Sequence, residues 1–469
     1  MAEVVIIGGG LAGQTAAMLL AADGHHVRVL ERDPEPPAAD ATEAWESWER
    51  RGVNQFRMLH YFLPRFRQIV ETELPAIAAA LDADGALRLN PLHGMPMEMS
   101  GGLREDDERF TVLTGRRPVV EAAVGRVTAR TPGVEVVRGV GVTGLLTGDE
   151  QIDGVPHVVG VVTDTAEELR ADLVVDAGGR RSALPRLLAD VGARPPLEER
   201  DDCGFVYYGR HFRSADGSVP PAFGPLLMHQ DSISILTLPA DNGTWGVGLV
   251  ASANDAAMRA TRDADVWTRV LASYPLTAHW LDGEPMTDIA VMAKIEDRHR
   301  AFVVDGVPVV TGLAPVGDSW ACTNPSVGRG ASIAVVHACA LRDLLRRVGP
   351  DDPVELATAW HRSTVETVEP YYRDTLAFDR HRLAEIDAQI AGVPYETDDP
   401  GWLLGGALGT AAGRDPELLR GYLEIVSLLA RGVDVLARPG VAERALALGA
   451  DGEPLPGPTR AELLALVAG

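Results

Sequence analysis

Residues 1–31, MAEVVIIGGGLAGQTAAMLLAADGHHVRVLE, contain the pattern that decides the fold. The β-branched run at 4–7 is typical of a buried parallel strand. Glycines follow at once, and residues 11–23 then repeat apolar positions at helical spacing before a glycine suited to end a helix. A second β-branched run lies at 26–30. The order strand, helix, strand within about 30 residues predicts a β-α-β unit.

The glycines between this strand and helix have the spacing G-x-G-x-x-G, at Gly8, Gly10 and Gly13. The first permits a tight turn, the second lets the backbone approach a pyrophosphate, and the third lets the helix pack closely on the strand. Leu11 and Ala12 open the helix, whose N-terminal N–H groups would face the phosphates. The loop therefore predicts a dinucleotide site.

An acidic residue, Glu31, ends the second strand near the spacing expected of a carboxylate that hydrogen-bonds a ribose. A carboxylate here disfavours NADP, because it would repel the 2′-phosphate, although the adjacent Arg32 weakens that argument. The fingerprint alone does not distinguish NAD from FAD, so a second motif has to decide.

That second motif begins at residues 309–319, VVTGLAPVGDS, a predicted buried strand that runs into a Gly-Asp turn. Asp318 follows the strand and is well placed to hold a polyol chain. The chain continues as WACTNPSVGRG over 320–330, where Gly328 and Gly330 at a helix start would let a flat ring approach backbone N–H groups. The helix end would stabilise negative charge on a reduced isoalloxazine. The combination favours FAD.

The remaining elements follow from hydrophobic periodicity and turn residues. We predict helices at 45–51, 57–69, 71–81, 119–128 and 331–348, strands at 134–142, 158–162, 173–175 and 307–311, an antiparallel sheet over 203–250, and mostly helix from 353 onward. The fold class expected is α/β, a Rossmann-like FAD-binding domain of the glutathione-reductase type with an antiparallel substrate sheet and a helical C-terminal region. The expected units are 1–200 (FAD-binding, with a helical insert at about 45–100), 201–290 (substrate sheet), 291–348 (the last part of the FAD domain) and 349–469 (helical).

Composition narrows the class of protein. The 469 residues include 43 basic and 67 acidic side chains, a formal net charge of −24, which argues against nucleic-acid and anionic-membrane partners. No apolar run is long enough to span a bilayer, and we expect no signal peptide before the first strand. The three cysteines form no C-x-x-C pair, so we expect neither a disulfide framework nor a metal site. These features predict a cytoplasmic protein.

Taken with a third strand-acid-glycine segment at 173–182, LVVDAGGRRS, the motifs resemble the FAD-dependent monooxygenases of the p-hydroxybenzoate hydroxylase superfamily. Within that superfamily the chain is most similar to the flavin epoxidases of polyether ionophore biosynthesis. The similarity covers nearly the whole chain. It is carried by Arg51-Gly52-Val53-Asn54-Gln55 with His60, Arg116-Arg117-Pro118-Val119-Val120-Glu121, Gly204-Phe205-Val206-Tyr207-Tyr208, Asn324-Pro325 with Gly328 and Gly330, and residues 454–468.

The resemblance implies a role for each matching position. The glycines of the fingerprint would hold the pyrophosphate, Glu31 the adenosine ribose, and Asp318 the ribityl hydroxyls. Further contacts implied are Arg51 and Arg117 to the phosphates or ribityl chain, Val142 to the adenine, and Pro325, Gly328 and Gly330 along the isoalloxazine. The chain departs from the superfamily at Asp176-Ala177-Gly178, where Asp-Gly is usual, and at Thr323, where an aromatic residue often precedes Asn-Pro.

The chemistry that the resemblance implies is insertion of one oxygen atom from O₂ into an apolar alkene or aromatic small molecule, by epoxidation or hydroxylation, through a C4a-hydroperoxyflavin. The substrate would be a secondary-metabolite intermediate. NAD(P)H would bind transiently and reduce FAD, or a separate flavin reductase would do so. The protein partner expected is therefore either that reductase or a second copy of this chain in a homodimer. No catalytic side chain is assigned, because the flavin carries the reaction. The pocket residues expected on the antiparallel sheet are Tyr207, Tyr208, Arg210, Met228 and Trp245.

Other classes share the FAD motifs. An FAD-dependent reductase or dehydrogenase acting on a prenyl or polyene substrate is the main alternative. A flavin halogenase would need a lysine beside its tunnel, whereas the only lysine, Lys294, lies outside the early segment where that residue falls. A non-enzymatic flavin-fold protein is disfavoured because Asp318 and the turn at Gly328–Gly330 would not be needed.

Overall fold

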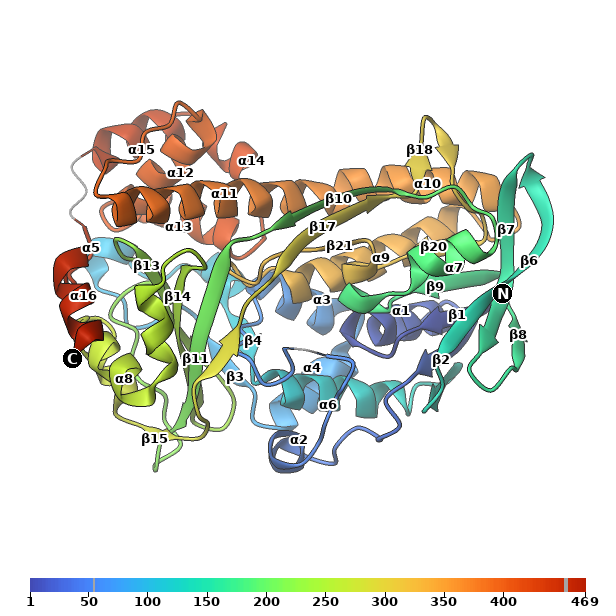
Figure 1. Ribbon diagram of the computed structural model, residues 1–469, viewed down its shortest axis with the longest axis horizontal. Helices are drawn as coiled ribbons and strands as arrows, with labels where there is room; N and C mark the ends of the chain where they lie inside the picture. The colour runs from blue at the N-terminus through green and yellow to red at the C-terminus, as the bar shows by residue number, and fades with distance from the viewer. Residues whose placement is uncertain (54, 451–453) are drawn as a thin grey trace.

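The computed structural model describes residues 1–53, 55–450 and 454–469, so Asn54 of the quoted motif lies outside the described residues. At its centre is a five-stranded parallel sheet in the order β20-β9-β1-β2-β5 (Figure 1). This confirms the predicted Rossmann-like α/β architecture. The strands and the first helix are β1 (Glu3–Ile7), α1 (Leu11–Ala22), β2 (His26–Glu31), β5 (Val134–Arg138), β9 (Leu173–Asp176) and β20 (Leu313–Pro315).

Both faces of the parallel sheet are buried. Val4 and Ile6 of β1 pack into the cluster that includes α1 and α9, whereas Val5 packs into the cluster on the other face. This alternation explains why β1 has an unbroken apolar run rather than an apolar-polar pattern. One face is covered by α1, α6 (Arg117–Thr128), α9 (Gly330–Arg347) and α10 (Pro353–Thr367), and the other by α7 (Leu184–Asp190) and the antiparallel strands β6 (Val142–Ile152), β7 (Val155–Thr163) and β8 (Glu168–Arg170).

The buried strand predicted at 307–311 is wrong in position. Residues Val307–Pro308 form β19, which pairs with β18 (Val303–Val304) in a small hairpin, and the strand that joins the parallel sheet is β20. Gly312 explains the difference. Its φ is +73°, and a Cβ there would lie 2.1 Å from the carbonyl oxygen of Val158, so the chain turns at this glycine before it enters the sheet. Val309 and Val310 are nevertheless fully buried, which is why they resemble a strand in the sequence.

Three predicted helices of the insert also differ from the structure. The insert contains α2 (Ala41–Glu46), α3 (Pro64–Glu73), α4 (Pro75–Ala83), β3 (Leu87–Leu89), α5 (Met97–Ser100), η1 (Glu105–Phe110) and β4 (Val112–Thr114). The helix predicted at 45–51 ends at Glu46, the one at 57–69 begins only at Pro64, and the one at 71–81 is interrupted at Leu74. A proline disfavours helical backbone at the residue before it. Leu63 and Leu74 both precede prolines that start helices. Residues 59–63 therefore lie in neither a helix nor a strand.

A second, antiparallel sheet has the order β12-β13-β14-β11-β15, with β16 also paired to β11, as predicted for 203–250. Its strands are β11 (Phe205–Arg213), β12 (Leu227–His229), β13 (Ile233–Pro239), β14 (Thr244–Ser252), β15 (Glu284–Pro285) and β16 (Ala290–Met292). Two long paired strands, β10 (Leu197–Asp202) and β17 (Glu296–Ala301), connect it to the FAD-type domain (Figure 1). One face of this sheet packs on α8 (Ala264–Ala272).

The C-terminal part is helical, as predicted, but its last helix leaves the others. Helices α11 (Glu369–Ala391), α12 (Pro400–Ala411), α13 (Pro416–Val426), α14 (Gly432–Leu436) and α15 (Val441–Gly449) lie together above the antiparallel sheet (Figure 1). Helix α16 (Arg460–Ala468) instead packs on α8, where Leu463 joins the core of the sheet. Within the described residues, no helix is both long and apolar enough to cross a membrane.

Candidate active site

A cavity of about 2200 Å³ lies where the parallel sheet, the antiparallel sheet and the C-terminal helices meet. Pockets for one small ligand are usually about 300–1,000 Å³, so this cavity has room for a dinucleotide and a second molecule. Every predicted cofactor-binding residue except Gly13 and Arg51 lies in its wall, namely Gly8, Gly10, Leu11, Ala12, Glu31, Arg32, Arg117, Val142, Asp318, Pro325, Gly328 and Gly330. The sheet geometry thus brings together segments that are far apart in the sequence.

The fingerprint loop fits a pyrophosphate. Gly8 has φ +103°, and a Cβ at Gly13 would lie 2.0 Å from the carbonyl oxygen of Gly8, so both positions require glycine for backbone reasons. Gly10 differs, because a Cβ there would meet no atom within 4 Å. The space beside Gly10 opens into the cavity at the N-terminus of α1, where N–H groups and the helix dipole favour an anion.

The Gly-Asp turn fits the polyol part of FAD. It forms a single 3₁₀ turn, η5 (Gly317–Ser319), directly after β20. The backbone N–H of Gly317 donates to Nδ1 of His337 on α9 (3.2 Å), which fixes the turn against the helix. Asp318 lines the cavity, and among the described residues its carboxylate accepts no hydrogen bond from the protein. It can therefore accept hydrogen bonds from the hydroxyl groups of a ligand.

A buried charge network lies beneath the fingerprint loop. Oε2 of Glu31 accepts from the backbone N–H of Gly9 (2.9 Å) and from Arg50 Nη2 (2.7 Å). Arg50 also pairs with Asp33 (3.0 Å) and with Glu121 on α6 (3.0 Å). Burial by itself would lower the pKa of the Arg50 guanidinium, but the three carboxylates raise it. Arg50 thus fixes the orientation of Glu31 at the cavity wall.

Sequence reasoning named Arg51 and missed Arg50. Arg51 is exposed and lies outside the cavity wall, whereas Arg50 is 3% exposed and makes the ion pairs. Arg117 does line the cavity, where its Nε donates to Glu121 (2.6 Å) and its Nη1 approaches Nε2 of His60 (3.2 Å). Burial of Glu121 would raise its pKa, but Arg117 and Arg50 lower it.

The antiparallel sheet presents only one face to the cavity. Along β11, Tyr207 and Gly209 face the cavity, and the intervening Tyr208 packs its ring with Phe212 and Trp267 of α8. This is the period of two expected of a strand between two packed layers. Tyr208 reaches the cavity boundary, but its ring belongs to the core behind the sheet.

The same alternation corrects three of the predicted pocket residues. Met228 and Trp245 are buried in the core between the sheet and α8, where the indole of Trp245 donates to the carbonyl of Trp280 (2.8 Å). Arg210 donates to the carbonyl of Thr287 (2.7 Å). None of the three lies in the cavity wall.

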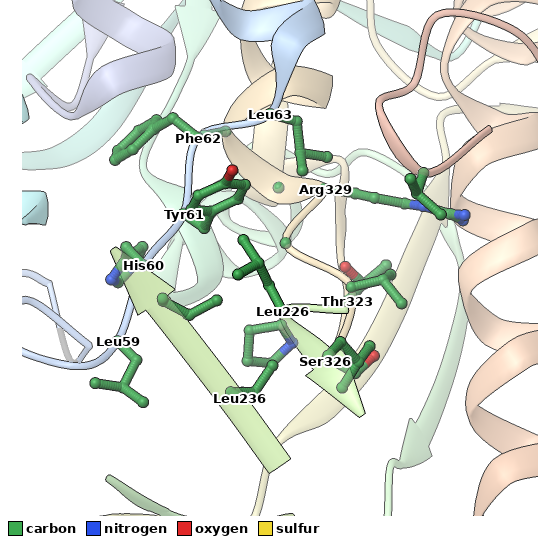
Figure 2. Close-up of a pocket in the computed structure, with 18 of the residues that line it drawn as sticks. Leu59, His60, Tyr61, Phe62, Leu63, Leu226, Leu236, Thr323, Ser326 and Arg329 are labelled. Carbon is green, nitrogen blue, oxygen red and sulfur yellow. The ribbon is translucent and has the colours of Figure 1, made fainter. Parts of the chain in front are cut away.

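One wall of the cavity is mainly apolar and comes from three segments. Figure 2 shows residues 59–63 of the insert facing Leu226, which directly precedes β12, and Leu236 of β13, with Thr323, Ser326 and Arg329 beside them. Leu59 packs closely against the sheet at Gly246, which has no side chain. A Cβ at that position would lie 2.3 Å from Cδ2 of Leu59. Next to it, Nδ1 of His60 bonds the carbonyl of Met58 (2.9 Å), and burial lowers the pKa of His60 to about 3. The imidazole of His60 is therefore neutral at neutral pH, and the nearest charge is the guanidinium of Arg117.

Comparison with known proteins agrees with this geometry. Residues 3–89 match the family described as FAD dependent oxidoreductase. The match covers the segment that contains the fingerprint loop. It is 29% identical over 449 residues to Protein Rv3254 of Mycobacterium tuberculosis (strain ATCC 25618 / H37Rv), covering 91% of this chain and 90% of that protein.

Two solved structures share the fold over most of the chain. PqsL of Pseudomonas aeruginosa, described as a probable FAD-dependent monooxygenase, superposes with a TM-score of 0.58 at 18% identity, covering 82% of this chain and 99% of that one. OxyS, an anhydrotetracycline hydroxylase from Streptomyces rimosus, superposes with a TM-score of 0.57 at 18% identity, covering 91% and 76%. The chain thus has the fold of FAD-binding monooxygenases.

Two glycine variants should separate packing from ligand binding in the fingerprint loop. Gly13→Ala forces a methyl group into the Gly8 carbonyl and should destabilise the flavin-free protein by about 1–3 kcal/mol, measured by chemical unfolding. Gly10→Ala meets no protein atom, so its flavin-free stability should match the wild type while its FAD affinity falls about tenfold or more. Unchanged FAD affinity in Gly10→Ala would show that no phosphate lies beside Gly10.

Arg50→Met should destabilise the fold by about 3–5 kcal/mol, because it leaves the buried Glu31 and Asp33 without their cation and Glu121 with Arg117 alone. The matched control is Arg28→Met, whose exposed pair with Glu135 should contribute only about 0–1 kcal/mol. The folded-state pKa of Glu121 is depressed, so its contribution is present above its unfolded pKa and is lost as the pH falls. The loss of stability caused by Arg50→Met should therefore become smaller as the pH falls. Equal losses of stability in Arg50→Met and Arg28→Met would contradict the role of Arg50.

Proposed function

We propose that the protein is an FAD-dependent monooxygenase that inserts one oxygen atom from O₂ into an apolar alkene or aromatic small molecule. The observation that carries this proposal is the continuity of one cavity from the fingerprint loop, past Asp318, to the apolar wall of the antiparallel sheet. A molecule on that wall lies next to the loop that would line a flavin ring. The substrate would be a secondary-metabolite intermediate.

Different residues would hold different parts of FAD. The N-terminus of α1 and Gly10 would hold the pyrophosphate, Glu31 the ribose, and Asp318 the ribityl hydroxyls. Pro325 and Gly328 precede the N-terminus of α9, where backbone N–H groups favour negative charge on a bound ring. FAD, when bound, supplies the electron transfer and the activation of O₂.

The protein side of the reaction is then the exclusion of water and the orientation of the substrate. Leu59, Leu226 and Leu236 form a wall that offers shape and apolar surface and no hydrogen bonds (Figure 2). Such a wall suits a neutral apolar molecule, since burying a charged group there would leave it unpaired. NAD(P)H bound transiently, or a separate flavin reductase, would supply the electrons.

Halogenation is disfavoured by the position of the single lysine. Lys294 is exposed and does not line the cavity, so it cannot act on a molecule held beside the flavin loop. An FAD-dependent reductase acting on a prenyl or polyene substrate would use the same cavity. Oxygen consumption distinguishes it from a monooxygenase.

The proposed reaction is tested with purified protein loaded with FAD. NADH, NADPH or a flavin reductase is supplied, together with a panel of neutral long-chain alkenes and polycyclic arenes under ¹⁸O₂. We expect O₂ consumption and one ¹⁸O atom in the product, measured by mass spectrometry. A hydrogenated product formed without O₂ would support the reductase, and a protein that cannot be loaded with FAD would overturn both readings.

Asp318→Ala should lower FAD affinity by about 100-fold, the loss expected when two hydrogen bonds to a carboxylate disappear. The fold should persist, because the carboxylate accepts no hydrogen bond from the described residues. Flavin fluorescence on titration measures the affinity, and Asp190→Ala on the surface of α7 is the matched control. Equal affinity in both variants would remove Asp318 from the flavin site.

A further inference from the structure

The loop at 323–329 is fixed by hydrogen bonds from three different elements, all of which converge on Asn324. Its side-chain oxygen accepts from the Tyr207 hydroxyl of β11 (2.7 Å), and its backbone N–H donates to Asp297 of β17 (2.7 Å). Its side-chain NH₂ donates to Asp379 of α11 (3.2 Å). Asn324 itself is 1% exposed. Two carboxyl groups are therefore buried directly behind the loop that lines the cavity.

Asp379 has an incomplete set of partners. Its Oδ1 accepts from Ser326 Oγ (2.6 Å) as well as from Asn324, whereas its buried Oδ2 has no hydrogen-bond partner among the described residues. Arg329 is close enough to favour the anion, yet its guanidinium donates to Thr375 and to the carbonyl of Tyr371 instead. An ionised carboxylate with one unsolvated oxygen is costly, so the arrangement favours a proton on this group.

Some of the groups around Asp379 raise the pKa of its carboxyl group and others lower it. Burial is the main cause that raises its pKa, to about 7, and the neighbouring Asp297 adds to the rise. Ser326, Asn324 and Arg329 oppose it. The phenol of Tyr207 on β11 and the thiol of Cys203, which precedes β11, also lie near this carboxyl. Burial raises the pKa of both groups, so they stay neutral. Asp379 thus exchanges its proton near neutral pH.

One hydroxyl separates this carboxyl from the cavity. Ser326 lies in the cavity wall (Figure 2), and its hydroxyl forms a hydrogen bond with Oδ1 of Asp379. It follows Pro325 in the loop proposed to line the flavin ring. When Asp379 is ionised, the Ser326 hydroxyl donates to its Oδ1; when Oδ1 carries a proton, the same 2.6 Å contact lets the carboxyl O–H donate to Oγ and leaves the serine O–H to point into the cavity.

We propose that Asp379 and Ser326 form a proton relay into the cavity. The carboxyl O–H of Asp379 passes its proton to Ser326 Oγ, while the Ser326 O–H proton moves to a basic atom held in the cavity. Asp379 is left as a carboxylate, and water reprotonates it through the same hydroxyl between turnovers. Ser326 is the group that touches the cavity contents, and Asp379 is a positioning residue that acts through it.

The inference rests on the proposed function, because oxygenation by this route consumes a proton. Substrate, O₂, NAD(P)H and H⁺ give oxygenated substrate, NAD(P)⁺ and water. The nicotinamide supplies two electrons and one proton as hydride, and the second proton must enter the closed cavity from outside. Among the described residues that line the cavity near the loop, Ser326 is bonded to a buried carboxyl that can provide it.

Asp379→Asn and Ser326→Ala test the relay, with Asp387→Asn as the control. In Asp379→Asn the amide oxygen keeps both hydrogen bonds of Oδ1, while the group can no longer release a proton. Ser326→Ala keeps the carboxyl and removes its link to the cavity. Asp387 lies on the same helix and bonds Ser252, away from the loop.

The first readout does not need activity. Infrared difference spectra of the wild type, recorded across neutral pH, should show a protonated carboxyl band that titrates near pH 7. In Asp379→Asn this band should be lost, leaving only the band of Asp297, whose pKa burial raises to about 6, and it should be unchanged in Asp387→Asn and Ser326→Ala. A wild type without the band, or a variant Asp379→Asn that retains it, would overturn the proposal whether or not the protein oxygenates a substrate.

The second readout is the reaction of the reduced, FAD-loaded protein with O₂ and substrate, followed against pH. Product formation should be about 100-fold slower in Asp379→Asn and in Ser326→Ala, without the wild-type pH dependence and with FAD affinity unchanged. Wild-type pH profiles in both variants would overturn the relay alone. Absence of ¹⁸O in the wild-type product overturns the proposed function instead, so the two failures are distinguishable.

Discussion

The close approach of α1 to the turn after β1 is the constraint on which the site depends. A Cβ at position 13 would lie 2.0 Å from the Gly8 carbonyl, so the helix reaches this position only because two glycines face each other. The approach brings the N-terminus of α1 to the edge where β1, β9 and β20 all end, since parallel strands share their carboxyl edge. Asp318, which follows β20, lies at that edge for the same reason.

This constraint also explains which parts could be predicted from the sequence. The β-α-β unit, the Gly-Asp turn and the antiparallel sheet depend on local patterns, and each was found where glycines or β-branched runs required it. Local patterns misled where proline intervened, as at Pro64 and Pro75, whose preceding residues cannot remain helical. They misled again at Gly312, where two buried valines resemble a strand although the chain turns after them.

The site residues that sequence reasoning missed are those defined by distant partners. Arg50 and Arg51 are adjacent in the sequence, and only the carboxylates of three separate segments decide which of them is buried. Tyr207 was placed on the correct face of the antiparallel sheet, whereas Arg210, Met228 and Trp245 were not, because the period of two shows that faces alternate and does not show which one α8 covers. One signal was available. Gly209 and Gly248 pair across neighbouring strands, and they leave the space that Leu59 fills.

The two ends of the cavity handle buried charge in opposite ways, and this difference follows from the ligand that each would hold. Beneath the fingerprint loop, each buried carboxylate of the network has a cationic partner, since Arg50 pairs with Glu31, Asp33 and Glu121, and Arg117 pairs with Glu121 as well. Behind the loop at 323–329, no cation of the described residues forms an ion pair with Asp297 or Asp379, and burial raises the pKa of both. A protonated Asp379 adds no negative charge beside the N-terminus of α9, so that helix end stays available to stabilise an anion in the cavity. A carboxyl group that is neutral when an anion forms beside it can also supply the proton that neutralises the anion.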